Sequence, residues 1–177
     1  MTAVGPGAHE TACAFINAIV WGEHLRIWDL LSPAAREHVL DAASRKGMDA
    51  VAIERARQGT WNRDEADVFL RSLVHGLRVD LSGVDLDHLV VTSTPIVLED
   101  GALRFDLECP SILPAALTGG ANWAAGAVIL CSVPIGDLSA APSTPSTPST
   151  PSTPSTPSES EWRVRRLVPR PATRPAS

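Results

Sequence analysis

Two residues that lie close together in the chain could do acid–base chemistry. Asp29 follows Trp28, and a carboxylate held beside an apolar ring could act as a buried general base. His24 lies five residues earlier, so on one helix the two side chains point to different faces and cannot form a tight pair. The simpler interpretation is an exposed acid at a helix end and a histidine on a solvated face. We therefore predict no catalytic residues, and keep Asp29 or His24 as the base of an alternative enzyme.

Four aromatic residues fall on faces that are expected to turn inward: Trp21, Trp28, Phe105 and Trp123. Core packing is the simpler explanation for each of them. The alternative is an apolar pocket with aromatic walls, which is the usual lining for a small hydrophobic ligand. These four are the predicted ligand-binding residues.

The three cysteines, Cys13, Cys109 and Cys131, are widely spaced among apolar neighbours. An odd count without a CxxC spacing is neither a disulfide framework nor a zinc site. No particular histidine can be assigned as the base of a catalytic thiol. We expect all three to be reduced core residues of a cytoplasmic protein.

The segment 85–88 holds two aspartates and a histidine. Three such groups in four residues lack the spacing of a recognised ligand set. The sequence also has no Gly-rich phosphate loop, no Ser-His-Asp order and no nucleophile elbow. We therefore predict no metal and no cofactor.

Charge is unevenly distributed in a chain whose net charge is −5. Residues 1–161 carry 10 basic and 20 acidic side chains, and the last 16 residues carry five arginines and no acid. An acidic body argues against nucleic-acid binding, because phosphate contacts need clustered cations. The arginines fit the outer face of a last strand and a frayed tail; the alternative is docking to an acidic partner.

The elements that must position these residues begin with helices. Apolar residues at helical spacing predict a helix over 10–31, which Gly22 bends or divides. Ser32 suits an N-cap and Pro33 a first turn, so a second helix starts there and stops at Gly47.

Two further helices complete the helical half. A short helix near 50–58 ends at Gly59. Asn62 followed by Glu65 resembles a capping box and opens a longer helix, after which the pattern changes at Gly76.

The rest of the chain has the alternation of strands. Residues 103–109 alternate apolar and charged side chains, which indicates a half-buried strand. Asp100-Gly101 just before it predicts a hairpin with a primed two-residue turn. A strand over 123–133 is apolar on both faces and is expected to be central, and 161–168 forms a final strand. Helices followed by an antiparallel meander predict an α+β fold.

The chain of 177 residues suits one domain, and no apolar run is long enough to span a membrane. Residues 142–158 repeat Pro-Ser-Thr and cannot form a core, so they form an extended spacer. The spacer lies between two strands that would pair, which makes it a loop insertion. The predicted parts are a disordered N-terminus (1–8), one domain (9–137 with 161–169), a disordered repeat (138–160) and a basic tail (170–177).

The segment AFINAIVWGEHLRIWDLLSPAAREHV resembles the opening of the nuclear-transport-factor-2-like superfamily, the cystatin-like cone that ketosteroid isomerases share. The matching features are the apolar helix, then Gly22-Glu23, Trp28, Leu30, Leu31, Ser32, Pro33 and Arg36. The resemblance implies a sheet wrapped around the long helix with a conical pocket open at one end. It also implies a homodimer. The chain has no tyrosine for an isomerase-type site, and residues 34–46 continue as a helix, which is typical of the accessory branch.

The sequence therefore predicts a cytoplasmic, non-catalytic binding module whose partner is a small apolar ligand or a protein. One alternative is an isomerase- or cyclase-like enzyme acting on a hydrophobic substrate. Another is a scaffold that recruits partners through spacer and tail, in which case the cone interior is filled. One lysine against fourteen arginines indicates a GC-rich bacterial genome.

Overall fold

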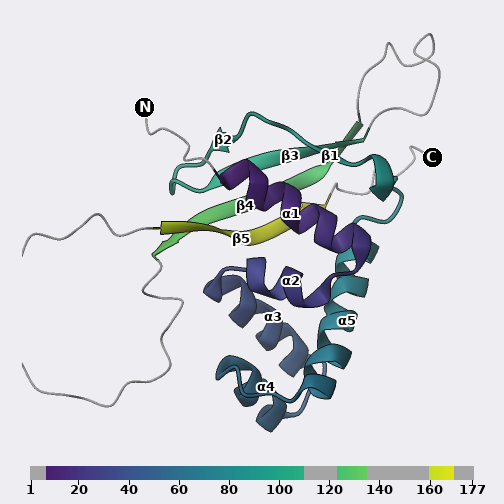
Figure 1. The fold of residues 1–177 in the computed structure, drawn as a ribbon, viewed down its shortest axis with the longest axis vertical. Helices are drawn as coiled ribbons and strands as arrows, with labels where there is room; N and C mark the ends of the chain where they lie inside the picture. The colour runs from purple at the N-terminus through teal and green to yellow at the C-terminus, as the bar shows by residue number, and fades with distance from the viewer. Residues whose placement is uncertain (1–6, 110–122, 135–159, 170–177) are drawn as a thin grey trace, which may run out of the picture.

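The structure is a computed structural model that describes residues 7–109, 123–134 and 160–169 (Figure 1). It has the predicted α+β class, with helices first and a curved antiparallel sheet after them. The helices are α1 (Ala8–Trp21), α2 (His24–Leu30), α3 (Pro33–Arg45), α4 (Ala50–Arg57), α5 (Arg63–Asp80) and the short 3-10 helix η1 (Leu86–His88). The strands are β1 (Val90–Val91), β2 (Ile96–Val97), β3 (Leu103–Cys109), β4 (Trp123–Pro134) and β5 (Ser160–Pro169).

The first predicted helix is two helices, divided at Gly22 as expected. Gly22 has a φ of 73°, a left-handed conformation that glycine adopts without strain, and its N–H caps the carbonyls of Ala18 and Ile19. The side chain of Ser32 then accepts the N–H of Ala35 and starts α3. The signals that the sequence gives for these three helices are therefore confirmed.

Helix α5 begins at the predicted capping box of Asn62 and Glu65 but does not stop at Gly76. It continues to Asp80, because Leu77 and Leu81 extend the apolar spacing of the preceding turns and pack into the core. Their burial outweighs the cost of about 1 kcal/mol for a glycine inside a helix.

The sheet has the order β1-β3-β4-β5, and β2 pairs with the first residues of β3. Strand β4 is central, as predicted, and pairs antiparallel with both β3 and β5. The hairpin before β3 differs from the prediction. Leu98 and Ala102 form its closing pair, so the loop has three residues, and its last residue, Gly101, takes the left-handed conformation at φ 79°.

The main core lies between α1 and the inner face of the sheet (Figure 1). Its largest fully buried side chains include Phe15 and Ile19 from α1, Phe105 and Leu107 from β3, Leu130 from β4 and Val164 from β5. A second, smaller cluster around Leu40, Ile53 and Ala56 joins α3 and α4 to the rest.

The chain between α2 and α3 runs beside the edge of β5. Leu31 forms a parallel bridge with Val164, and the N–H of Ser32, which is 1% exposed, donates to the carbonyl of Val164 at 2.8 Å. This contact ties the helical half directly to the last described strand.

The predicted end segments and the Pro-Ser-Thr repeat lie almost wholly outside the described residues. At their borders α1 already begins at Ala8 and β5 at Ser160. Among the described helices, none combines the length and the apolar content that a membrane crossing needs.

Candidate functional site

His24, at the start of α2, is held by α5. Its Nε2 lies 2.7 Å from Oδ1 of Asp67, and the other oxygen of Asp67 lies 2.7 Å from Nη2 of Arg71. The histidine therefore joins two helices through a network of polar side chains near the surface. It is not brought together with Asp29.

Asp29 lies exposed in the last turn of α2. Its backbone carbonyl oxygen accepts Nη2 of Arg36 at 3.1 Å and also accepts Nη1 of Arg163 from β5. The contacts of Asp29 that position α2 are thus made by the main chain. An exposed acid at a helix end is the simpler of the two interpretations that the sequence allows.

Arg36 completes the cap of α2. Its Nε donates to the carbonyl of Trp28 at 3.0 Å, and its guanidinium lies 5.5 Å from the centre of the Trp28 ring. Burial lowers the pKa of Arg36, Asp29 opposes this, and the nearby cation of Arg163 lowers the pKa further. Two arginines therefore satisfy carbonyls at the negative end of one helix.

Trp28 packs in an aromatic cluster that the sequence does not reveal. Its ring centre lies 5.4 Å from that of Trp61 and 6.0 Å from that of Phe69, and the latter two are 5.5 Å apart. At these distances the rings touch one another, so they fill the space between α2 and α5. In the sequence, only the helical spacing of Phe69 within α5 could have indicated that this residue belongs to the cluster.

Trp21 does not face inward, and the prediction that it does is wrong. Its side chain is 77% exposed. In α1, Ile16 and Ile19 point to the core, and a residue two positions after Ile19 is turned by about 200° from it. Trp21 therefore lies on the opposite face of the helix.

The other two predicted ligand-binding aromatics belong to the sheet. Phe105 in β3 is fully buried against α1, where its ring lies 5.7 Å from that of His9. Trp123 begins β4 opposite Cys109, and its side chain lies outside what the structure describes. Ligand binding by either residue stays a prediction.

Cys13 and His9 form a pair, one turn apart in α1, that sequence reasoning missed. The sulfur of Cys13 lies 3.6 Å from Nε2 and 3.9 Å from Nδ1 of His9, and Nε2 lies 3.4 Å from the carbonyl oxygen of Val91. Burial raises the pKa of the Cys13 thiol, and the carboxylate of Glu10 raises it further. A raised pKa keeps the thiol protonated, whereas a nucleophilic cysteine needs the thiolate.

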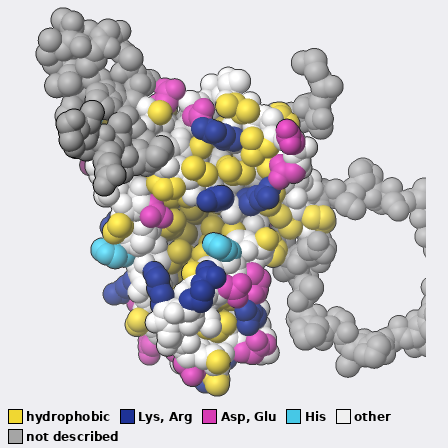
Figure 2. All heavy atoms as spheres, turned by 180° about the vertical axis from the view of Figure 1, so that it is seen from behind, with side chains coloured by type: hydrophobic (Ala, Val, Ile, Leu, Met, Phe, Trp, Pro, Cys, Tyr) yellow, Lys and Arg dark blue, Asp and Glu magenta, His cyan; other side chains and the backbone are white. Residues whose placement is uncertain are grey.

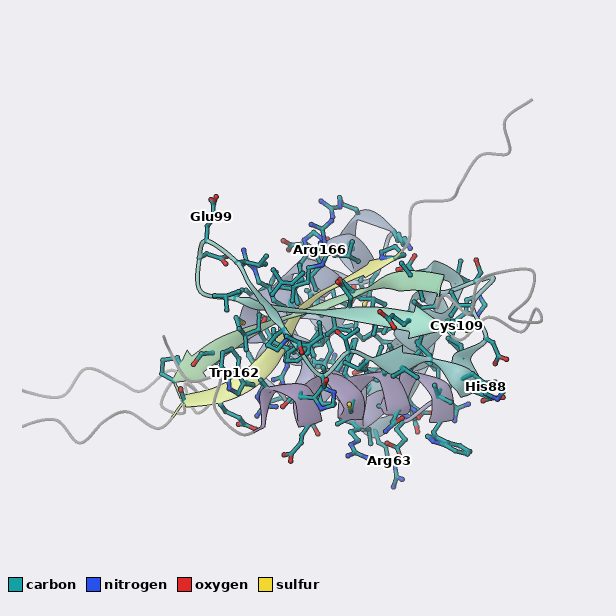
Figure 3. All side chains as sticks on the ribbon, turned by 90° about the horizontal axis from the view of Figure 1, so that it is seen from above. Arg63, His88, Glu99, Cys109, Trp162 and Arg166 are labelled. Atoms are coloured by element: carbon teal, nitrogen blue, oxygen red, sulfur yellow. The ribbon has the colours of Figure 1, made fainter. Side chains whose placement is uncertain are left out.

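The segment 85–88 forms a local turn. Nδ1 of His88 lies 2.8 Å from Oδ2 of Asp85, and this hydrogen bond holds the pKa of Asp85 below its usual range. The thiol of Cys109 lies 3.7 Å from the carbonyl of Asp85, at the same end of the sheet (Figure 3). Within 7–109, 123–134 and 160–169, no three His, Cys, Asp or Glu side chains group as metal ligands.

The outer face of the sheet, away from α1, carries a line of paired residues. Ile96 pairs with Arg104, Arg104 with Ile129, and Ile129 with Arg166, so these side chains share one face. We call these four residues the outer row. Ile96 is 50% exposed, both arginines are exposed and Ile129 is half-buried.

Ion pairs surround the outer row. Nε of Arg104 lies 2.8 Å from Oδ1 of Asp106, and Arg165 binds the carboxylate of Asp100. Arg166 has no acidic partner in the part of the chain that the structure describes. Figure 2 views this face and shows apolar side chains at its centre with basic side chains among them.

Comparison with known proteins found no family model, no curated protein and no solved structure that matches the chain.

Proposed function

We propose that the protein is a non-catalytic binding module that docks a protein partner on the outer face of its sheet. One observation carries this proposal: apolar side chains are buried on the inner face of the sheet and left exposed on its outer face. On the inner face Phe105, Leu107 and Leu130 are fully buried. On the outer face Val90, opposite Glu108, and Ile96, opposite Arg104, are 52% and 50% exposed, and exposed apolar side chains beside an arginine are typical of an interface.

The other partner that the sequence predicts, a small apolar ligand, has less support than a protein. Of the aromatics assigned to a pocket wall, Trp21 points to solvent and Phe105 is closed into the core. Trp28 is packed against two other rings. Such placements favour a protein partner over a small apolar ligand.

The enzyme alternative also has less support. A general base must reach a substrate in a site from which water is largely excluded. His24 is engaged by Asp67, and Asp29 lies exposed on a different helix turn. Neither side chain adjoins the buried inner face.

We further infer that the chain is a nuclear-transport-factor-2-like cone of the branch with a helical continuation. The support is the resemblance of residues 14–39, now seen as α1, α2 and α3, together with a curved antiparallel sheet that follows them. The free cysteines Cys13, Cys109 and Cys131 favour a reducing, cytoplasmic setting.

A photocrosslinking experiment tests the docking face. A photoreactive amino acid replaces Ile96 on the outer face or, as a control of similar exposure, Val51 on α4 (56% exposed). In cells that produce the full chain, we expect one adduct of defined mass from position 96 and none from position 51. The adduct should disappear when Ile129→Glu places a charge in the outer row.

Adducts of equal yield from both positions, or none from position 96, would contradict the proposal. Native mass spectrometry of the purified protein adds an independent check. A tightly held small molecule would favour the ligand-binding alternative instead.

A further inference from the structure

We propose that the outer row receives an acidic amphipathic helix of the partner, which lies across the strands and places carboxylates on Arg104 and Arg166. This inference rests on the proposed function, because it names the kind of surface that the outer face binds. It follows from spacing, charge and exposure along the row.

Spacing is fixed by the sheet. Neighbouring strands lie about 4.8 Å apart, so Arg104 and Arg166, on β3 and β5, stand about 9.6 Å apart with Ile129 midway between them. In an α-helix, residues i, i + 3 and i + 7 share a face at about 0, 4.5 and 10.5 Å. In an extended strand, residues of one face recur at about 6.6 and 13.2 Å. The helix matches the row and the strand does not.

Charge determines what the end positions of that helix carry. Arg166 lacks an acidic partner among the described residues, and Arg104 is bound there only to the half-buried Asp106, two residues further along β3. The guanidinium group of Arg166 and the two Nη atoms of Arg104 are therefore open to carboxylates, which such groups bind with two parallel hydrogen bonds. The matching helix has acidic residues at i and i + 7.

Exposure determines the middle position. Ile129 is half-buried between the two arginines, and Ile96 extends the row with a half-exposed apolar side chain. An apolar residue at i + 3 of the partner helix would cover Ile129 and remove that surface from water.

The acidic groups around the row favour a protein over nucleic acid. Asp106 and Asp100 lie on β3 and the hairpin before it, close to the arginines. They would repel the continuous charge of a phosphate backbone, whereas a helix with two acids offers charge only where the arginines stand.

Three synthetic peptides of about 15 residues, each with a helix-favouring sequence, test the inference. The first carries Glu at i and i + 7 with Leu at i + 3. The second has Gln in place of Glu, and the third has Lys at i + 7. Fluorescence anisotropy measures their binding to the full-length protein, to Arg166→Glu and to Arg63→Glu. Arg63 lies on the opposite side of the molecule, so it gives the same charge change away from the row (Figure 3).

We expect the Glu peptide to bind the wild type at least about tenfold more tightly than the Gln peptide, since two charge-assisted pairs are lost. Arg166→Glu should weaken the Glu peptide by about tenfold, and Arg63→Glu should leave it within about twofold. The Lys peptide should prefer Arg166→Glu to the wild type. Because only a folded Arg166→Glu variant can bind the Lys peptide more tightly, this result also excludes misfolding as the cause of the weaker binding of the Glu peptide.

Equal binding of the Glu and Gln peptides, or equal losses in the two variants, would overturn the inference. So would tighter binding of duplex DNA than of the Glu peptide, with the same sensitivity to Arg166→Glu. Self-association of the protein that Arg166→Glu abolishes would make a second copy the occupant instead. In each of these cases the Ile96 crosslink decides separately whether the outer face docks a protein at all.

Discussion

Pro134 and Ser160 are register partners at the adjoining ends of β4 and β5, although residues 135–159 lie between them in the chain. Partners in an antiparallel ladder have Cα atoms about 4.5–5.5 Å apart. The strands on either side of residues 135–159 therefore pair with each other as the sequence predicts, and their adjoining ends meet.

We predict that the domain folds without this insertion. Replacing residues 135–159 with Asn-Gly should leave the melting temperature unchanged or raise it, since each halving of a loop lowers the closure cost by about 0.6 kcal/mol. Thermal unfolding followed by circular dichroism measures this, with a scrambled repeat of equal length as control. A loss of more than about 10 °C in the deletion alone would contradict the pairing.

Arg78 holds the end of α1 from α5. Its Nε donates to the carbonyl of Ile19 at 3.0 Å and its Nη2 to that of Val20 at 2.7 Å. Arg78→Ala should lower the free energy of unfolding by about 1 kcal/mol, because two helix-end carbonyls lose a charged donor. Arg71→Ala, which removes a surface ion pair with Asp67 of the same helix and leaves the contact of Asp67 with His24 in place, should cost about 0.5 kcal/mol or less. Urea titrations that gave equal losses would show that the cap contributes nothing.

Replacing glycine with alanine should have opposite effects on stability at Gly126 and at Gly76. A Cβ at Gly126 would lie against the carbonyl oxygen of Val168, well inside van der Waals contact, and φ there is 150°. Gly126→Ala should destabilise the fold by about 1–3 kcal/mol. Gly76 lies inside α5 with open space around it, so Gly76→Ala should stabilise by about 0.5–1 kcal/mol. Calorimetric melting temperatures that moved in the same direction for both would refute this reading of β4 and β5.

Asp100 and Arg165 give the hairpin before β3 a pH-dependent contact. The hydrogen bond with Arg165 lowers the pKa of Asp100, and the N–H of Ala102 contributes to this. A native pKa below the unfolded value of about 3.9 means that the pair stabilises the fold above that pH. The stabilisation is lost as the pH falls through the native pKa.

The variant Asp100→Asn should therefore be less stable than the wild type near neutral pH, and the difference should shrink as the pH falls below the unfolded pKa of about 3.9. Urea midpoints across this range measure the difference. If the difference in urea midpoint between the two proteins stayed constant down to low pH, the contact of Asp100 with Arg165 would not be the source of the pH dependence.

Local signals in the sequence were sufficient for much of the fold. Gly22, Ser32 and the Asn62–Glu65 box act through atoms within a few residues, so their effects can be predicted from the chain alone. The alternation in β3 likewise needs only a period of two.

Contacts between separate helices could not be predicted from the sequence. The contacts of Trp28 with Trp61 and Phe69 require α2 to lie against α5, which no local pattern specifies. The exposure of Trp21, by contrast, follows from its place two residues after Ile19, so helical spacing alone could have predicted it. The pairing of His9 with Cys13 is local, since residues i and i + 4 adjoin on a helix, and a search at that spacing would have found it.

The contact between α2 and β5 sets an order of events for the newly made chain. Asp29 and Arg163 are 134 residues apart, and Ser32 also needs Val164 to satisfy its buried N–H. During synthesis the helices emerge long before β5, so α2 and α3 have no edge to attach to until β5 has been made. Contacts of such long range slow folding far more than they alter stability. Until β5 arrives, the backbone N–H and C=O groups along the edge of β4 that pairs with β5 stay open to other chains, and this interval is when the protein is most exposed to aggregation.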